Sequence, residues 1–364
     1  MKIKGIKIKF QFSTLLIVAL VGFYSATFYN SLIPDASIWE LILVGVINGI
    51  IIIFSILIHE LSHSLMALRH GLKISEIELN LFGGVSKMEE EPRTPKSEFI
   101  IAIVGPLSSF ILGAVLLIFL YLPIPLPAFV LVILFYSGIT NIGLGIFNLL
   151  PAFPMDGGRV LRSILWSRKK DLLSATKVAS KVGIFFSYSL VVLGFIQWIF
   201  LGDFGGMWLI LMGFILSSAA RRSYYQTKSE VKLSNVLVRD ILAQKFVVPY
   251  ELPLIDAIKY YFMAFNQYYF PVVDAGEFVG ILHLDDIKQI PIEKQTEYIV
   301  GDIAKNLSEF PIVFDEESGK DVMKILTQMD KKPNIAVVKE RHDQNIIGFI
   351  DEPELLNTLK LKGS

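Results

Sequence analysis

Two histidines and a glutamate form the pattern with the clearest chemical meaning in this chain. Residues 58–63 read Ile-His-Glu-Leu-Ser-His, so His59 and His63 are four residues apart with Glu60 beside the first. On a helix, residues four apart lie on one face, and both imidazoles can therefore reach a single metal ion. In a His-Glu-x-x-His pattern the metal is zinc and the glutamate is a candidate general base. The spacing predicts a hydrolytic metal site.

The third ligand of this site is expected to be a carboxylate. A catalytic zinc ion usually takes three protein ligands and leaves a fourth position for water. The chain has no cysteine, and its remaining histidines lie at the edge of its apolar part or beyond it, at His70, His283 and His342. Asp156 is the acidic residue in an otherwise apolar stretch near the same end of the predicted membrane segments. Prolines and glycines around it interrupt the helix, and irregular backbone at membrane depth can line a cavity.

Two plainer interpretations of these residues stay open. The motif could be a buried polar cluster without a metal, or part of a cytoplasmic loop. Asp156 could cap a short helix that begins near Gly157, because aspartate is a preferred N-cap residue. Against the first interpretation, ionisable side chains inside a membrane are costly and usually mark function.

The composition is that of a membrane protein. The 364 residues are 53% hydrophobic and 19% charged, with a mean hydropathy of +0.56, whereas soluble chains carry about 25% charged residues. The apolar residues gather in uncharged blocks before about residue 230. The chain balances 34 basic against 34 acidic residues, which argues against a nucleic-acid partner, because such proteins carry a strongly basic domain.

Six segments are apolar enough to cross a bilayer as helices, which takes roughly 20 residues each. The predicted spans are residues 14–29, 38–68, two within 98–156 on either side of the proline-rich stretch 122–127, then 182–201 and 204–220.

Lysine and arginine set the predicted orientation. They collect in the loops on one side of the membrane and are missing from the opposite loops, around residues 30–39, 122–128 and 201–206. The positive-inside rule then places both termini in the cytoplasm of a multi-pass protein of the cell membrane. A cleavable signal peptide, with a poor cleavage site at residues 25–27, is the alternative for the N-terminus.

The C-terminal part alternates charged and apolar residues as a soluble α/β domain does, and it repeats. Stretches 237–242 and 299–304 open two units about 62 residues apart, and Gly280 and Gly348 take corresponding places in them. An internal duplication of this length indicates two copies of one supersecondary unit. The predicted domains are 1–229 and 230–364, with repeats at about 234–292 and 296–361.

The membrane part resembles the site-2 protease family of intramembrane metalloproteases, over about residues 5–222. Besides the histidine motif, the resemblance rests on Gly105-Pro106 and on Asn148, Pro151, Asp156 and Gly157. It implies that His59, His63 and Asp156 bind zinc, with Glu60 as general base. It also implies that Asn148 is a polar partner for the substrate or its oxyanion. Members of the family cut membrane-embedded substrates, often to release a regulatory domain.

An exposed strand is expected to hold the substrate. A substrate helix must unwind before a metal can reach a peptide carbonyl, since its carbonyls are bonded within the helix. Strand pairing would hold the unwound segment by its backbone. The candidate edge is the stretch 79–85, which contains Phe82, Gly83 and Gly84 and resembles a glycine-containing stretch of the family. The alternative is that the two glycines form only a turn.

Hydrolysis also needs water at the site. The polar residues of the apolar segments that could line an aqueous path are Ser55, Ser62, Ser64, Asn141 and Asn148.

The C-terminal repeats resemble a pair of CBS domains, over about residues 234–361. Such pairs often bind adenine nucleotides such as ATP and commonly associate, which implies a homodimer. In nucleotide-binding members a Ser or Thr follows the Gly-x-x element and an Asp follows three residues later. Here His283 and Asp286 take these places in the first repeat, and Asp351 and Glu354 in the second. Asp286 keeps a ribose contact open, whereas Asp351 would repel phosphate. A purely structural or dimerising module is the alternative.

The expected function is that of an intramembrane zinc endopeptidase that hydrolyses peptide bonds of membrane proteins, open to control by nucleotide at the CBS pair. A CBS-regulated transporter or channel is the rival, because intramembrane carboxylates and histidines also mark ion pathways. Transporters typically show related hydrophobic halves, and residues 1–222 show none. A catalytically inactive relative that only binds membrane partners is the third interpretation.

Overall fold

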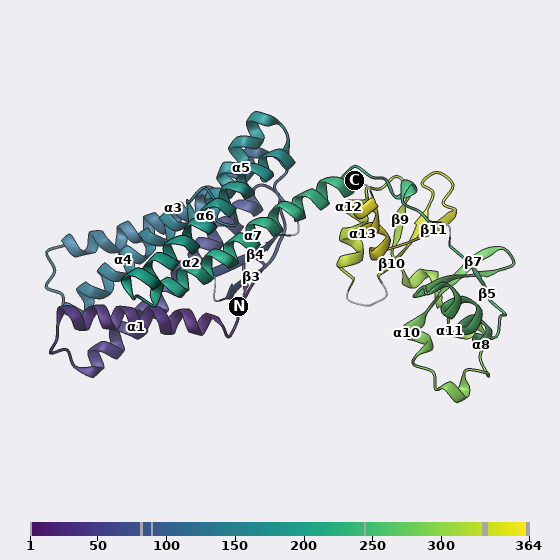
Figure 1. Cartoon of the computed structure of the whole chain (residues 1–364), viewed down its shortest axis with the longest axis horizontal. Coiled ribbons are helices and arrows are strands. Elements are labelled where there is room, and N and C mark those ends of the chain that lie inside the picture. The colour runs from purple at the N-terminus through teal and green to yellow at the C-terminus, as the bar shows by residue number, and fades with distance from the viewer. Residues whose placement is uncertain (1, 81–82, 89, 244, 330–333, 362–364) are drawn as a thin grey trace. The chain divides into compact units, whose positions relative to one another are not determined.

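The chain forms two compact units in the computed structural model, Met1–Tyr225 and Gln226–Ser364 (Figure 1). The structure describes residues 2–80, 83–88, 90–243, 245–329 and 334–361. Each unit has hydrophobic cores of its own, so each has the packing of a separate domain.

Five helices in the described part of the first unit are long and apolar enough to span a membrane. They are α1 (Thr14–Leu32), α2 (Ile38–Arg69), α3 (Pro95–Ile118, followed by a 3-10 turn, Phe119–Tyr121), α4 (Ala128–Asn148) and α6 (Leu172–Leu201). All five fall on predicted spans. The prolines of residues 122–127 separate α3 from α4, because proline cannot continue a helix. The predicted polytopic helical fold is confirmed.

Two further helices begin in this unit. The short α5 (Asp156–Lys169) follows the irregular segment after α4. The helix α7 (Gly205–Ser234) covers most of the sixth predicted span, but it continues through residues 221–234, beyond the predicted end of that span. This segment contains no glycine or proline, so nothing in its sequence ends the helix. Its basic residues also make α7 less apolar than the other five, and the sixth crossing stays a prediction.

Glycines let neighbouring membrane helices approach closely. A Cβ atom added at Gly22 of α1 would lie 2.9 Å from the backbone oxygen of Gly45 of α2, and the reverse distance is the same. A Cβ atom at Gly113 of α3 would lie 2.8 Å from the backbone oxygen of Gly138 of α4. Membrane helices commonly pack through such small residues, since burial away from lipid adds no hydrophobic driving force.

A four-stranded sheet connects the N-terminus to the segment between α2 and α3. Its strands are β1 (Lys2–Ile3), β2 (Ile6–Phe10), β3 (Ile74–Asn80) and β4 (Gly83–Met88), in that spatial order. Strands β2 and β3 are parallel, whereas β3 and β4 are antiparallel with Leu79 opposite Gly84. Within the described residues β4 is therefore an edge strand. Ile77 and Leu79 of β3 belong to one buried cluster with Ile52 and Ile56 of α2, which fixes the sheet to the helices.

The second unit contains the same arrangement of strands twice, as the duplication predicted. In the first copy β5 (Val248–Pro249) is parallel to β6 (Tyr269–Asp274), which is antiparallel to β7 (Glu277–His283). A short strand from the start of the second repeat, β8 (Lys305–Asn306), pairs with β7. In the second copy β9 (Ile312–Phe314) is parallel to β10 (Ile335–Lys339), which is antiparallel to β11 (Ile346–Asp351).

Helices connect and follow these strands in the same order in both copies. The connecting helix of the first copy is α8 (Leu254–Ala257), continued by a π turn (Ile258–Phe262) and α9 (Met263–Phe265), and that of the second is α12 (Gly319–Thr327). The hairpins are followed by α10 (Leu284–Ile287) and α13 (Glu352–Leu361), and α11 (Val300–Ile303) precedes β8.

Candidate metal centre

His59, His63 and Asp156 come together inside the first unit. The Nε2 atoms of the two histidines lie 3.2 Å apart, and Asp156 Oδ2 lies 3.1 Å from the first and 3.0 Å from the second. Ligands at 2.0–2.1 Å from a tetrahedral zinc ion are about 3.3 Å from one another. The three side chains thus form a group whose spacing suits a zinc ion.

Hydrogen bonds on the far side of each imidazole direct its Nε2 lone pair toward this point. His63 Nδ1 lies 2.6 Å from the carbonyl oxygen of Ile101, which can only accept, so Nδ1 carries the proton. His59 Nδ1 lies 2.9 Å from Ser109 Oγ, which can accept in the same way. Metal-binding histidines are oriented by such bonds. Three acceptor atoms therefore meet where both histidines are 4% exposed, an arrangement that a bound cation stabilises.

One face of α3 supports the two histidines. Ile101, Gly105 and Ser109 follow at four-residue spacing, which keeps them on one side of the helix. The outer two bind the imidazoles, and Gly105 leaves room for them. A Cβ atom at Gly105 would lie 2.1 Å from His63 Nε2 and 2.8 Å from His59 Nε2. Sequence reasoning marked Gly105 only through a family resemblance and missed Ser109, because an isolated serine in an apolar helix carries no signal of its own.

Asp156 is the first residue of α5, and its carboxylate does not cap this helix. The N-cap of α5 is Met155, which makes no side-chain hydrogen bond to the helix. The short helix near Gly157 is therefore present, but the Asp156 carboxylate contacts the histidines. Gly157 lets the start of α5 lie against the preceding segment, because a Cβ atom there would lie 2.2 Å from the backbone oxygen of Leu149.

A buried ion pair ties α5 to α3. Arg162 Nε donates to Glu98 Oε1 at 2.6 Å, and the two side chains are 4% and 1% exposed. Glu91 lies 3.4 Å from the same guanidinium, and the ring of Phe153 lies 5.3 Å from it. The pair therefore links the segment around Asp156 to the helix that orients both histidines. Sequence reasoning missed this contact, because nothing near Arg162 in the sequence indicates that Glu98 is its partner.

Glu60 contacts the edge strand β4. Ser86 Oγ donates to Glu60 Oε2 at 2.9 Å and lies 3.0 Å from Ser64 Oγ. A Cβ atom at Gly84 would lie 2.1 Å from Glu60 Cγ. Because Gly84 has no side chain, the backbone of β4 lies directly against this glutamate.

The other predicted site residues lie elsewhere. Asn148 is the last residue of α4, and its Nδ2 donates to the Leu144 carbonyl at 3.0 Å. Gly83 belongs to β4 as Gly84 does, whereas Phe82 lies outside the described residues. In the second unit Asp286 Oδ1 accepts from Lys305 Nζ at 2.6 Å. Asp286 Oδ2 is buried and has no hydrogen-bond partner within the described chain.

The acids of the second repeat surround a buried lysine. Lys245, with a side chain 9% exposed, lies 3.1 Å from Glu354 Oε1 and 3.7 Å from Asp351 Oδ2, and it donates to the Tyr269 hydroxyl. Burial, with the two carboxylates nearby, holds the pKa of Tyr269 well above its ordinary value. Sequence reasoning missed Lys245, because its partners lie in the other repeat.

Comparisons with known proteins identify the family. The sequence model of peptidase family M50 matches residues 48–190, and that of the CBS domain matches residues 238–293. Zinc metalloprotease MJ0392 of Methanocaldococcus jannaschii is 31% identical over 366 residues, covering 99% of this chain and 96% of that protein. Rip3 of Mycobacterium tuberculosis is 28% identical over 367 residues, covering 99% and 93%. The chain therefore belongs to peptidase family M50.

Among solved structures, the site-2 protease of Methanocaldococcus jannaschii matches 62% of this chain and 93% of its own, with 32% identity and a TM-score of 0.43. Membership of the family confirms the predicted resemblance to site-2 proteases. The protein is a multi-pass membrane zinc metalloprotease with a CBS domain, and the transporter interpretation loses its support.

Replacing Gly105 by alanine is expected to remove zinc, because the added methyl group would displace both imidazoles. Metal analysis of the purified wild type should give about one zinc per chain, and Gly105→Ala close to none. The matched control is Gly143→Ala on α4, where an added Cβ meets no atom within 4 Å. Full zinc content in Gly105→Ala would contradict this account of the site.

Replacing Arg162 by methionine is expected to lower the free energy of unfolding by about 3–5 kcal/mol, because it leaves the Glu98 charge buried and unpaired. Zinc affinity should fall about 10- to 100-fold as the support of Asp156 loosens. Glu98→Leu combined with Arg162→Met should restore much of the stability but not the zinc affinity. Arg93→Met, which breaks an exposed pair with Glu90, serves as control. Equal stability of Arg162→Met and the control would show that the buried pair is unimportant.

Proposed function

We propose that this protein hydrolyses peptide bonds of membrane-embedded protein substrates at a zinc ion held by His59, His63 and Asp156. The observation that carries the proposal is the meeting of three buried acceptor atoms 3.0–3.2 Å apart. The Nδ1 protons of both histidines have acceptors within reach in α3, so the donor set fits zinc without rearrangement of the imidazoles.

Glu60 is proposed as the general base. Bound zinc would polarise the scissile carbonyl and lower the pKa of water toward about 7. Glu60 takes a proton from the attacking water and later delivers it to the leaving amine. The hydrogen bond from Ser86 occupies one carboxylate oxygen of Glu60. The other oxygen of this carboxylate remains available to the attacking water.

Asn148 is proposed to bind the substrate carbonyl or its oxyanion. Its position supports this role, because α4 ends at Asn148 and the chain then returns to Asp156 through the irregular segment. Its amide donates to the Leu144 carbonyl. An amide has two N–H groups, so the second can donate to a substrate while the first keeps this bond.

The edge strand β4 is proposed to hold the unwound substrate. A strand added to the free side of β4 would be bound by backbone hydrogen bonds. The proposal includes Phe82, Gly83 and Gly84. The contact between Gly84 and Glu60 supports it, because a peptide paired with β4 near this residue would pass close to the general base. The hydroxyl groups of Ser64 and Ser86 are hydrogen-bonded to each other beside Glu60. These polar groups support access of water to Glu60.

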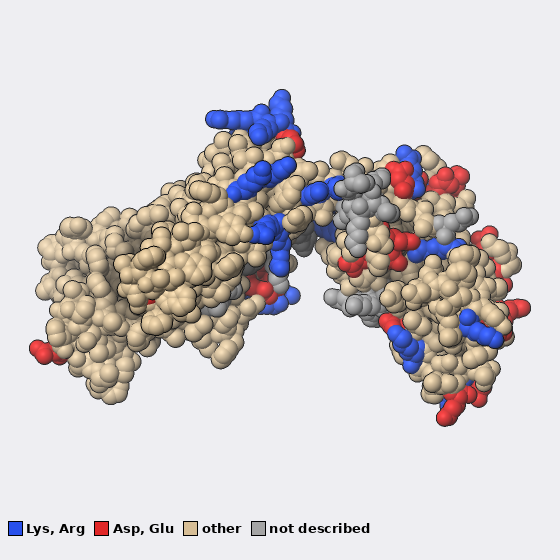
Figure 2. Space-filling model, viewed as in Figure 1, with Lys and Arg blue, Asp and Glu red and all other residues tan. Residues whose placement is uncertain are grey.

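The bilayer orientation is proposed from charge. Basic side chains gather at one end of the helix bundle, and the opposite end shows none on the visible face (Figure 2). Such an asymmetry favours the cytoplasm for the basic end. With six crossings, we propose that both termini and the CBS pair lie on that side. The proposed domains are 1–229 for the protease and 230–364 for the CBS pair, through which the protein would form a homodimer.

Adenine nucleotide is proposed to bind the first CBS repeat and to modulate cleavage. The buried Asp286 Oδ2 without a partner among the described residues supports this, because a ribose hydroxyl could donate to it, and Lys305 beside it offers a positive charge. In the second repeat, Asp351 takes the place that corresponds to His283 and would repel phosphate.

Glu60→Gln is expected to abolish cleavage and to keep zinc, whereas Asp156→Ala should lose both, because only Asp156 is a ligand. Single-span membrane proteins reconstituted with the enzyme in vesicles, with and without a chelator, provide the assay, and metal analysis provides the second readout. Wild-type protein that binds zinc but cuts none of the substrates would instead support the inactive-relative interpretation.

Asp286→Ala is expected to weaken ATP binding to the full-length protein at least about tenfold, the cost of one lost charge-assisted hydrogen bond. Calorimetry with ATP measures this. Asp285→Ala, at a neighbouring carboxylate that is 62% exposed, should leave the affinity unchanged. Absence of ATP binding in the wild type, or equal affinity in Asp286→Ala, would refute the nucleotide proposal and leave the protease proposal intact.

A further inference from the structure

Glu60, the proposed general base, leaves α2 on a different side from the two histidines. Successive residues of a helix point about 100° apart. The imidazoles of His59 and His63 contact α3, whereas Glu60 contacts β4. A glutamate has several rotatable bonds, so an unsupported one samples several rotamers. A general base must lie within hydrogen-bond reach of the water, and a support outside α2 is therefore needed to keep Glu60 in place.

Two serines supply a directed chain of hydrogen bonds to this glutamate. Ser86 Oγ donates to Glu60 Oε2 at 2.9 Å, and it lies 3.0 Å from Ser64 Oγ. A serine hydroxyl has a single proton to donate. Because the proton of Ser86 goes to Glu60, Ser64 must be the donor in the second bond. In such a chain each hydrogen bond polarises and strengthens the next.

The hydroxyl of Ser64 is directed at β4 instead of at its own helix. A serine inside a helix commonly donates to the carbonyl four residues before it. In α2, Ser55 and Ser62 do so, at 2.8 and 2.7 Å. Ser64 is 0% exposed, yet its hydrogen bond goes to Ser86, 22 residues further along the chain. This buried hydroxyl therefore serves a contact between two elements.

The strand β4 restrains Glu60 at two points. Gly84 and Ser86 are two residues apart, so they lie on the same side of the strand. A Cβ atom at Gly84 would lie 2.1 Å from Glu60 Cγ, so the backbone there limits the stem of the side chain. Ser86 holds its carboxylate end. Both contacts come from the edge strand that is proposed to bind the substrate.

We infer that Ser86, supported by Ser64, is a positioning residue that holds the Glu60 carboxylate in register with a substrate paired to β4. One strand then sets the place of both the substrate backbone and the base. The inference rests on the proposed function and deepens it. Loss of the hydroxyl leaves the zinc ligands and the backbone of β4 in place but lets Glu60 turn away. The effect should fall on the chemical step and leave substrate binding unchanged.

Kinetics with the reconstituted single-span substrates test this role. Ser86→Ala should lower kcat about tenfold, because small displacements of a catalytic group cost this much or more, with KM and zinc content unchanged. Ser86→Thr keeps a hydroxyl and should restore most of the rate. Ser64→Ala should lower kcat about two- to threefold, since it removes only the polarising bond. Combined with Ser86→Ala it should add nothing, because the two serines act through one bond.

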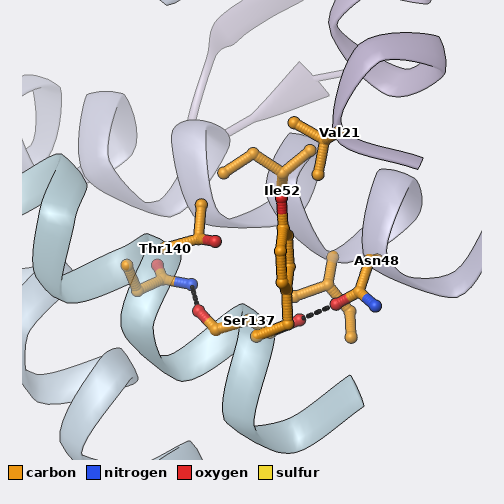
Figure 3. Close-up of a pocket in the computed structure, with 8 residues that line it drawn as sticks. Val21, Asn48, Ile52, Ser137 and Thr140 are labelled. Carbon is orange, nitrogen blue, oxygen red and sulfur yellow. Dashed lines mark hydrogen bonds between the residues drawn. The ribbon is translucent and has the colours of Figure 1, made fainter. Parts of the chain in front are cut away.

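A second serine on α2 provides the matched control. Ser137 of α4 donates to Asn48 Oδ1 of α2 at 2.6 Å (Figure 3). It resembles Ser86 in donating to a side-chain oxygen of α2 from another element. Asn48, however, precedes His59 by eleven residues, or about 16 Å of helix. Ser137→Ala should therefore lower the melting temperature and leave kcat unchanged.

A thermal double-mutant cycle adds a readout that needs no cleavage. Ser86→Ala should lower the melting temperature by about 2–4 °C, the effect of one lost hydrogen bond in a chain of this kind. In Glu60→Ala protein the same change should lower it much less, because the partner is gone. Equal shifts in the two backgrounds would overturn the inference, even if the wild type cuts no substrate and the protease proposal fails.

The kinetic outcomes are equally decisive. An unchanged kcat in Ser86→Ala, or a loss that Ser86→Thr does not restore, would contradict the positioning role. A higher KM or a loss of zinc in Ser86→Ala would also contradict it, since the serine would then only support the fold of β4. Cleavage by the wild type in any of these cases would leave the protease proposal standing.

Discussion

Three acceptor atoms brought together inside an apolar bundle are the constraint on which the first unit depends. Asp156 Oδ2 and the Nε2 atoms of His59 and His63 lie 3.0–3.2 Å apart, and all three are acceptors when each imidazole is protonated only at Nδ1. A divalent cation bound there would remove the repulsion. Such binding would also contribute folding free energy to this unit.

The helix α3 is the support of this arrangement, although it supplies no ligand. Its Ile101 carbonyl and Ser109 hydroxyl orient the imidazoles, and its Glu98 holds Arg162 of the helix that begins with Asp156. Missing side chains matter as much as those present. Gly105 leaves space for the histidines, and Gly84 brings the edge strand against Glu60. Two glycines on different elements thus determine how closely a backbone can approach the reactive groups.

Much of the fold follows from patterns that are local in sequence. The apolar spans predicted α1 to α4 and α6, because a bilayer needs about 20 apolar residues from every crossing helix. The repeat near residues 237 and 299 predicted the two copies of the C-terminal unit. The sixth predicted span ends at residue 220, yet the helix continues to Ser234, because charge alone does not end a helix. The cation pairs Arg162–Glu98 and Lys245–Glu354 were missed, since a sequence does not reveal which distant carboxylate a basic residue will meet.

The candidate metal ligands could be named from the sequence by itself, since zinc chemistry restricts both residue type and spacing: two histidines one helical turn apart and a carboxylate in an apolar stretch. Tertiary structure alone decided what surrounds them. The acceptors behind the imidazoles, the strand against Glu60 and the ion pair between Arg162 and Glu98 all depend on contacts between elements far apart in the chain. Such contacts arise from how helices and strands pack. The side-chain periodicity of one element does not reveal which other elements pack against it.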